Sequence, residues 1–160
     1  LLGYHAMAGA PGAVLSHTQS STQWFACHLN GRLVGEIGQF AFITGHYKVP
    51  IVCVTGDRAA CEEARALLGV IETVAVKQGL GQHCAIMEAP AKARAMIREG
   101  VARALRRRGD CGPFAYETPI KVKLELKDPV FAERYVRLGW KRLDGRTVTK
   151  VAATALDIID

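Results

Sequence analysis

A strand–helix–strand pattern between residues 49 and 77 constrains the fold of this chain more than any other feature. The segment VPIVCVTGD is rich in Val and Ile and ends on a Gly-Asp pair, which is typical of a buried strand followed by a turn. The next segment, RAACEEARALL, repeats apolar residues at helical spacing, and Asp57 precedes it as a candidate N-cap. The short strand IETVAVK follows. Strands that alternate with helices in this way predict an α/β fold, with a layered sheet flanked by helices.

The rest of the sequence predicts two hairpins and further helices around this unit. Asn30-Gly31 and Asp144-Gly145 are turn signals between strand-like segments, so we expect a hairpin at each. The segment PIKVKLELK alternates apolar with charged residues, which indicates a strand with one solvated face. The spacing of apolar residues predicts helices within residues 35–47, 90–108 and 128–139. We therefore expect an α/β region in residues 1–111 and a smaller, more antiparallel α+β region in residues 112–160.

Composition and charge argue against several classes of partner. The net charge of +6 comes largely from arginines between residues 94 and 108, which have no interleaved aromatic residues and suit the solvated end of a helix. We therefore expect no nucleic-acid partner. No apolar run approaches the ~20 residues that span a bilayer, so we expect no membrane partner. The five cysteines are an odd number without a CxxC pair, which favours a reducing, cytoplasmic location over a disulfide framework.

Three residues in the N-terminal third are candidates for chemistry. His5 and His17 flank a Gly/Ala/Pro stretch that suits neither a helix nor a strand, and His5 follows an apolar segment at the place where α/β folds put functional side chains. Glu36 lies in VGEIG, and a carboxylate in apolar surroundings needs a cation or strong donors. A metal ion is one answer, and a nearby Arg or Lys is another. A lone histidine is more often a satisfied polar residue than a ligand, so spacing alone leaves both interpretations open.

Lys77 is a further candidate, at the start of the glycine-bearing segment QGLGQH, which we expect to be a loop after a strand. A lysine there would stabilise a substrate carboxylate or an oxyanion, or would simply be a surface residue. A cysteine hydrolase based on Cys27 and His28 is excluded, because neighbouring residues of a strand point to opposite faces.

Four blocks of the sequence, in this order, resemble the zinc-dependent D-aminopeptidases of the DppA type: GYHAMAGAPGAVLSHT, CHLNGRLVGEIG, VPIVCVTGDRAACEEA and VAVKQGLGQHCAIMEAPAKA. The resemblance implies a metallopeptidase with two zinc ions per complete site, which removes N-terminal D-amino acids such as D-Ala from short peptides. It implies that His5 and Glu36 are metal ligands and that His17 is the catalytic group, as nucleophile or general base. It also implies a ring-shaped homo-oligomer.

The resemblance lacks one part of the family's pattern. The Asp-x-Glu-Gly and Asp-Ser-His motifs that supply the family's remaining ligands are absent from these 160 residues. Two protein ligands are too few for zinc, which takes at least three plus water. We therefore expect a fragment that is a poor catalyst alone, in which residues 1–111 are the C-terminal part of the catalytic domain and residues 112–160 are a truncated smaller region.

An alternative function is that of a non-catalytic assembly or binding module within a larger oligomer. Large apolar residues in the later segment are the candidate subunit contacts for this function, although each of them also suits a protein core. They are Phe114, Tyr116, Phe131 and Trp140.

Overall fold

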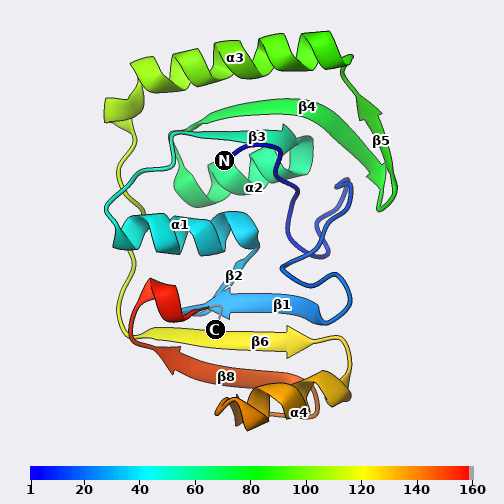
Figure 1. The fold of residues 1–160 in the computed structure, drawn as a ribbon, viewed down its shortest axis with the longest axis vertical. Coiled ribbons are helices and arrows are strands. Elements are labelled where there is room, and N and C mark those ends of the chain that lie inside the picture. The colour runs from blue at the N-terminus through cyan, green and yellow to red at the C-terminus, as the bar shows by residue number, and fades with distance from the viewer. Residues whose placement is uncertain (159–160) are drawn as a thin grey trace.

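The computed structural model describes residues 1–158 and contains two sheets (Figure 1). The two strands of the predicted strand–helix–strand unit belong to one of these sheets, which has three strands. Strand β3 (Cys53–Asp57) leads into helix α2 (Arg58–Leu68), which returns the chain to β4 (Glu72–Gly81), parallel to β3. Helix α3 (Pro90–Arg106) lies across the sheet on the side opposite α2 (Figure 1). Asp57 caps α2 as predicted, since its Oδ1 accepts the N–H of Ala60 at 2.7 Å. The layered α/β fold is therefore confirmed.

A five-stranded antiparallel sheet occupies the other end of the molecule (Figure 1). Its order is β2-β1-β6-β8-β7. The strands are β1 (Trp24–Leu29), β2 (Arg32–Val34), β6 (Ile120–Leu126), β7 (Lys141–Arg142) and β8 (Thr147–Ala152). Both predicted hairpins are confirmed, and Asn30 and Gly31 have the positive φ angles that a two-residue turn requires.

The remaining helices link and cover these sheets. They are α1 (Glu36–His46), α4 (Pro129–Arg137) and the short 3-10 helices η1 (Arg108–Asp110) and η2 (Ala155–Asp157). Helices α1 and α2 lie between the two sheets in Figure 1. The largest apolar core joins the antiparallel sheet to α1 and α4, through side chains such as Phe42, Leu124 and Trp140.

The segment QGLGQH corrects one expectation, because its first four residues continue a strand and only Gln82 and His83 form a turn. Strand β4 continues through Lys77 to Gly81 and then pairs with β5 (Cys84–Met87) in a hairpin that the sequence pattern does not indicate. The physical reason lies at Gly79, where an added Cβ would collide with the backbone of Gly12 and Ala13. This glycine serves a close approach between two segments and does not mark a turn.

The antiparallel sheet takes strands from both sides of the predicted boundary at residues 111 and 112. Strands β1 and β2 belong to the first segment, yet β1 pairs with β6 of the second. The division into two regions stays a prediction.

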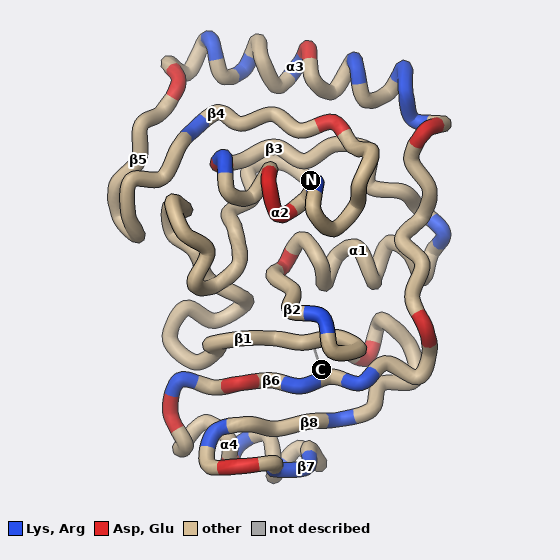
Figure 2. The backbone as a smooth tube through the Cα atoms, turned by 180° about the vertical axis from the view of Figure 1, so that it is seen from behind, with Lys and Arg blue, Asp and Glu red and all other residues tan. Residues whose placement is uncertain are grey.

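Helix α3 and the later aromatic residues refine two further expectations. The arginines at residues 106–108 are exposed, as expected, and Figure 2 shows basic residues along this helix. The apolar side of this helix is only partly buried, since Leu105 is 52% exposed. The aromatic residues that were candidate subunit contacts belong to the largest apolar core. Trp140 is buried in this core, and Phe114, Tyr116 and Phe131 are partly buried and pack against it. Within residues 1–158 no helix combines the length and the apolar character needed to cross a membrane.

Candidate metal centre

A loop of residues 5–19 carries both candidate histidines and begins where the chain leaves the three-stranded sheet. Residues 1–4 run beside β3, with the Thr55 N–H donating to the Leu1 carbonyl and the Tyr4 N–H donating to the Thr55 carbonyl. Tyr4 forms a parallel bridge with Gly56, where any side chain would collide with the Tyr4 backbone. His5 therefore follows the carboxyl end of a strand-like segment, as expected for a functional residue of an α/β fold.

The loop reverses direction at glycines and is tied to both neighbouring elements. Gly9 and Gly12 have positive φ angles of 79° and 63°, which glycine adopts without steric cost. The N–H of Val14 donates to Oδ2 of Asp57 at 3.0 Å, in a buried contact. At the β4–β5 turn, Gln82 accepts the Leu15 N–H through its carbonyl oxygen at 2.9 Å.

The backbone on either side of His17 is strained. Leu15 and Gln19 have φ angles of 55° and 56°, a left-handed conformation that residues with side chains rarely adopt. Such angles persist where surrounding contacts enforce them. Here the side chains of Ser16 and Gln82 hydrogen-bond at 2.9 Å, and the Ala8 N–H donates to Thr18 Oγ1 at 3.2 Å.

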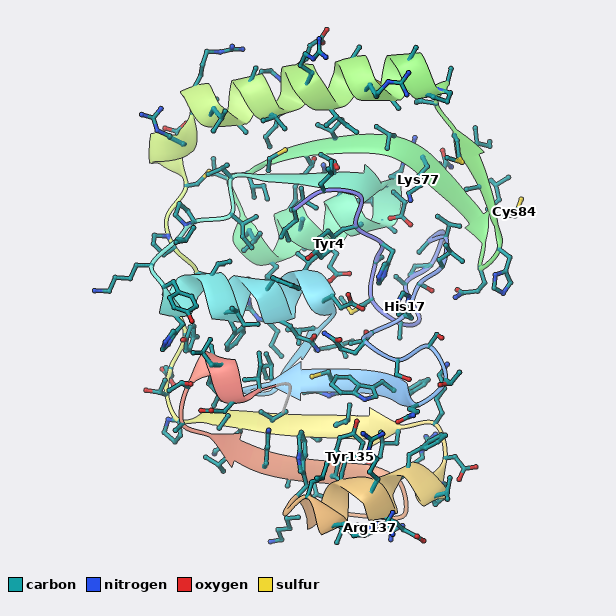
Figure 3. The ribbon with its side chains drawn as sticks, in the orientation of Figure 1. Tyr4, His17, Lys77, Cys84, Tyr135 and Arg137 are labelled. Carbon is teal, nitrogen blue, oxygen red and sulfur yellow. The ribbon has the colours of Figure 1, made fainter. Side chains whose placement is uncertain are left out.

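His5, His17 and Glu36 converge into one group of three donors (Figure 3 labels His17). Oε1 of Glu36 lies 3.7 Å from Nε2 of His5 and 3.6 Å from Nε2 of His17. The two imidazole rings stack with their centroids 3.9 Å apart. One donor atom from each side chain lies within 4.8 Å of the others. The expected convergence of His5 with Glu36 is confirmed, whereas the role of each residue stays a prediction.

Backbone groups orient all three donors toward the space they share. Nδ1 of His5 lies 3.0 Å from the Ala6 carbonyl oxygen, and Nδ1 of His17 lies 2.7 Å from that of Leu15. A carbonyl oxygen only accepts, so each neutral ring carries its proton on Nδ1 and leaves the Nε2 lone pair facing Glu36. The Gln19 N–H donates to Glu36 Oε1 at 2.8 Å. Glu36 is also the first residue of α1, where the helix dipole stabilises a negative charge.

The spacing of these donors fits a metal ion better than a direct ion pair. Separations of 3.6 and 3.7 Å are too long for strong hydrogen bonds between the histidines and Glu36. Two ligands bound to a tetrahedral zinc ion at about 2.1 Å lie about 3.4 Å apart. Two imidazole nitrogens and a carboxylate oxygen are also a donor set that suits zinc.

Glu63 contacts the segments that carry His5 and Glu36, and the sequence pattern did not indicate it as a functional residue. Its Oε2 accepts the Met7 N–H at 2.7 Å, and the same carboxylate lies against Gly35, with the Gly35 backbone lowering the pKa of Glu63. Burial is the main cause that raises the pKa of Glu63 to about 7, with smaller contributions from Asp57 and Glu36. The sequence signal that could have identified Glu63 was its spacing from Ala60. A residue three positions after Ala60 lies on the apolar face of α2.

Lys77 does not belong to this group of donors. It lies on β4 and lines a separate cavity of about 160 Å³, together with residues such as Arg58 and Glu88. Figure 3 shows Lys77 apart from His17. The other three histidines are also elsewhere: His83 is exposed in the β4–β5 turn, His46 is exposed at the end of α1, and His28 lies 3.8 Å from Glu125 in the antiparallel sheet.

Comparisons with known proteins agree with this geometry. The sequence matches the family model of the M55 peptidases, described as D-aminopeptidase, over residues 1–160. It is 35% identical over 156 residues to a D-aminopeptidase of Bacillus subtilis, a match that covers 97% of this chain and 54% of the relative. The structure superposes with a TM-score of 0.92 on a Zn-dependent D-aminopeptidase, DppA from Bacillus subtilis, described as a self-compartmentalizing protease. That pair is 30% identical, and the match covers 98% of this chain and 58% of the other. The chain thus spans little more than half the length of these relatives.

Proposed function

The chain belongs to the M55 family of D-aminopeptidases, and we propose from this premise that it is part of a zinc-dependent D-aminopeptidase. The proposed substrates are short peptides with an N-terminal D-amino acid such as D-alanine. The observation that carries the proposal is the group formed by His5, His17 and Glu36, since it offers zinc-type donors in a relative of a Zn-dependent enzyme.

His5 and Glu36 are the proposed zinc ligands. When bound, zinc supplies Lewis-acid chemistry, which polarises the scissile carbonyl of a peptide. The chain's own contribution is orientation: the Ala6 carbonyl sets the ring of His5, and the Gln19 N–H holds one oxygen of Glu36. Groups that fix a ligand in this way raise metal affinity, because less ordering is needed on binding.

His17 is the proposed catalytic group, as nucleophile or general base. The Leu15 carbonyl fixes its Nδ1 proton, so Nε2 carries the lone pair that either role requires. Stacking on His5 places the ring next to the proposed ligands. Nε2 of His17 is as close to Glu36 as that of His5, so the competing assignment is a third ligand.

We propose two zinc ions per complete site, with the further donors supplied by parts of the protein outside this chain. Two ions need more ligands than three side chains provide. The relatives are nearly twice as long as the segment matched here, which leaves room for those donors. A chain with only these three donors should bind zinc weakly and be a poor catalyst.

Assembly and location form a further part of the proposal. We propose a ring-shaped homo-oligomer, supported by the description of the structural relative as self-compartmentalizing. Free thiols at all five cysteines support the cytoplasm as its location. Lys77 is proposed to bind substrate, and the polar cavity beside it is its support. The non-catalytic assembly module has less support, because the aromatic residues suggested as its contacts serve the core.

The proposal is tested by zinc dependence and stereochemistry in the full-length protein. Removing zinc with a chelator should abolish hydrolysis of D-alanyl dipeptides, and adding zinc back should restore it. L-alanyl dipeptides are the control substrate and should be cleaved much more slowly. Zinc-loaded protein that leaves D-alanyl dipeptides intact would show the proposal to be wrong.

A further inference from the structure

The two backbone segments that carry the proposed zinc ligands both contact one side chain, that of Glu63. Met7 lies two residues after His5 and donates its N–H to Oε2 of Glu63 at 2.7 Å. Gly35 immediately precedes Glu36 and lies against the same carboxylate, with its backbone lowering the pKa of Glu63. The carboxylate of Glu63, on α2, therefore joins the loop that carries His5 to the start of α1, which carries Glu36.

The contact at Gly35 is too close for any other residue. A Cβ built there would lie 2.6 Å from Oε1 of Glu63 and 2.6 Å from Cβ of Met7. The φ angle of Gly35 is −90°, which any residue can adopt, so the requirement for glycine is one of space. The ligand-bearing segments and Glu63 thus approach each other to the limit that backbone atoms allow.

One hydrogen bond and one close backbone contact set the position of this carboxylate. A cavity of about 220 Å³ lies beside it, lined by residues that include Met7, Gly38 and Leu67. A carboxylate on the apolar face of a helix is costly to bury. The Met7 N–H offsets part of that cost, and the contact with Gly35 places the carboxylate between the two segments.

We propose that Glu63 is a positioning residue, which holds the backbones that carry His5 and Glu36 at the separation that zinc requires. This inference rests on the proposed function, since it assigns Glu63 a part in the same metal centre. Glu63 acts through Met7 and Gly35 and does not itself bind the ion.

Zinc affinity of the Glu63→Gln variant of the full-length protein tests the inference. Glutamine keeps the size of the side chain and one acceptor oxygen, but its NH₂ group would face either the Met7 N–H or the backbone of Gly35. We expect zinc affinity, measured by competition with a chromogenic chelator, to fall about 10- to 100-fold. Saturating zinc should restore most of the turnover, because the ligands and His17 are intact. Glu62→Gln is the matched control, on the exposed neighbour in the same helix, and should leave zinc affinity unchanged.

The outcomes separate this inference from the proposed function. An unaltered protein that binds no zinc overturns the proposed function, and this inference with it. An unaltered protein that binds zinc while Glu63→Gln binds it equally well overturns this inference alone. If Glu63→Gln does not fold, Gly35→Ala replaces it, since that change keeps the carboxylate but forces the segments apart. Unchanged zinc affinity in a folded Gly35→Ala variant likewise overturns the inference.

Discussion

The antiparallel sheet and the metal-centre loop are held in place by different interactions. The sheet packs large apolar side chains, including Leu124, Leu126 and Val148, all without exposed surface. The apolar core under the loop consists mostly of alanines: Ala6, Ala13, Ala60 and Ala64, with Ile37 and Val54. Alanine buries little area, so this packing stabilises the loop less than leucines stabilise the sheet.

Polar contacts replace the missing apolar area at the loop. Buried polar side chains in the described residues are Thr18, Gln39, Thr55, Asp57 and Thr147, and four of these contact residues 3–19. Thr55 accepts the Gly3 N–H, and Asp57 accepts the Val14 N–H. The loop, which must present polar donors, is thus fixed by directional hydrogen bonds, whereas the sheet is stabilised by the packing and burial of large apolar side chains.

The largest expected effect of a single change is on catalysis. His17→Ala in the full-length protein should lower kcat for D-alanyl dipeptides about 100-fold or more, with zinc content nearly intact. His5→Ala should lower both, because zinc affinity depends on the number of ligands. Zinc analysis and a peptidase assay on the two variants measure this, with the exposed His83→Ala as control. Equal zinc loss in both would make His17 a ligand, and unchanged turnover would remove it from the mechanism.

In the sheet, Leu124→Ala should affect stability and leave the metal centre alone. Leu124 is fully buried, so its truncation should cost about 2 to 5 kcal/mol of unfolding free energy in urea titrations. Zinc affinity of the folded variant should match that of the unaltered protein. Leu143→Ala, at an exposed position, should change stability by less than about 0.5 kcal/mol. A weakened zinc site in folded Leu124→Ala would show that the two regions are coupled.

In the loop, Asp57→Ala should affect both properties. The change removes the cap of α2 and leaves the buried Val14 N–H without an acceptor, at a combined cost of about 2 to 3 kcal/mol. Zinc affinity should fall because the loop loses an attachment. Asp128→Ala is the matched control: Asp128 caps α4 through the Val130 N–H, far from the loop in sequence, and its loss should cost about 1 kcal/mol without an effect on zinc. Equal zinc affinity in both variants would contradict the role given to Asp57.

The smallest expected effect is a pH dependence of the metal-free protein. The pKa of Glu63 is raised to about 7 from 4.5, mainly by burial, so the folded state binds more protons than the unfolded state between these values. Its contribution to stability is present below pH 4.5 and is lost as pH rises toward 7. Partial exposure reduces the effect to about 1 to 2 kcal/mol. Urea titrations at several pH values should show this loss in the unaltered protein and not in Glu63→Gln; parallel pH profiles would refute it.

The pattern of apolar residues correctly predicted the elements that are held by the packing of large apolar side chains. Strand β6 alternates Ile120, Val122, Leu124 and Leu126 inward, and α2 and both hairpins also follow their sequence signals. The β4–β5 hairpin was missed because Gly79 is chosen for its contact with the loop, which local sequence does not reveal. The same limit applies to the exposed side of α3, since pattern identifies an apolar face without showing what covers it.

The candidate site was predicted through family resemblance more than through physical pattern. Spacing alone left a metal-binding and a structural interpretation of His5 and His17 open, because their meeting point depends on positive φ angles at Gly9, Gly12 and Leu15. Glu63 was missed, since an acid on an apolar helix face makes sense only once Met7 and Gly35 are placed against it. Lys77 was recognised as a polar residue near a glycine segment, but strand β4 carries it to a different cavity.

The contact between Gln82 and the segment before His17 affects how the sequence of such a chain can vary over evolution. Turns of β-hairpins are ordinarily places where insertions and deletions accumulate. Here the β4–β5 turn hydrogen-bonds Leu15 and Ser16, at a sequence separation of 66 residues for the Ser16 contact. One added residue would displace Gln82 and, with it, the imidazole of His17. Homologous chains are therefore expected to keep the length of this turn and, because the Gln82 side chain makes both Ser16 contacts, to keep the glutamine as well.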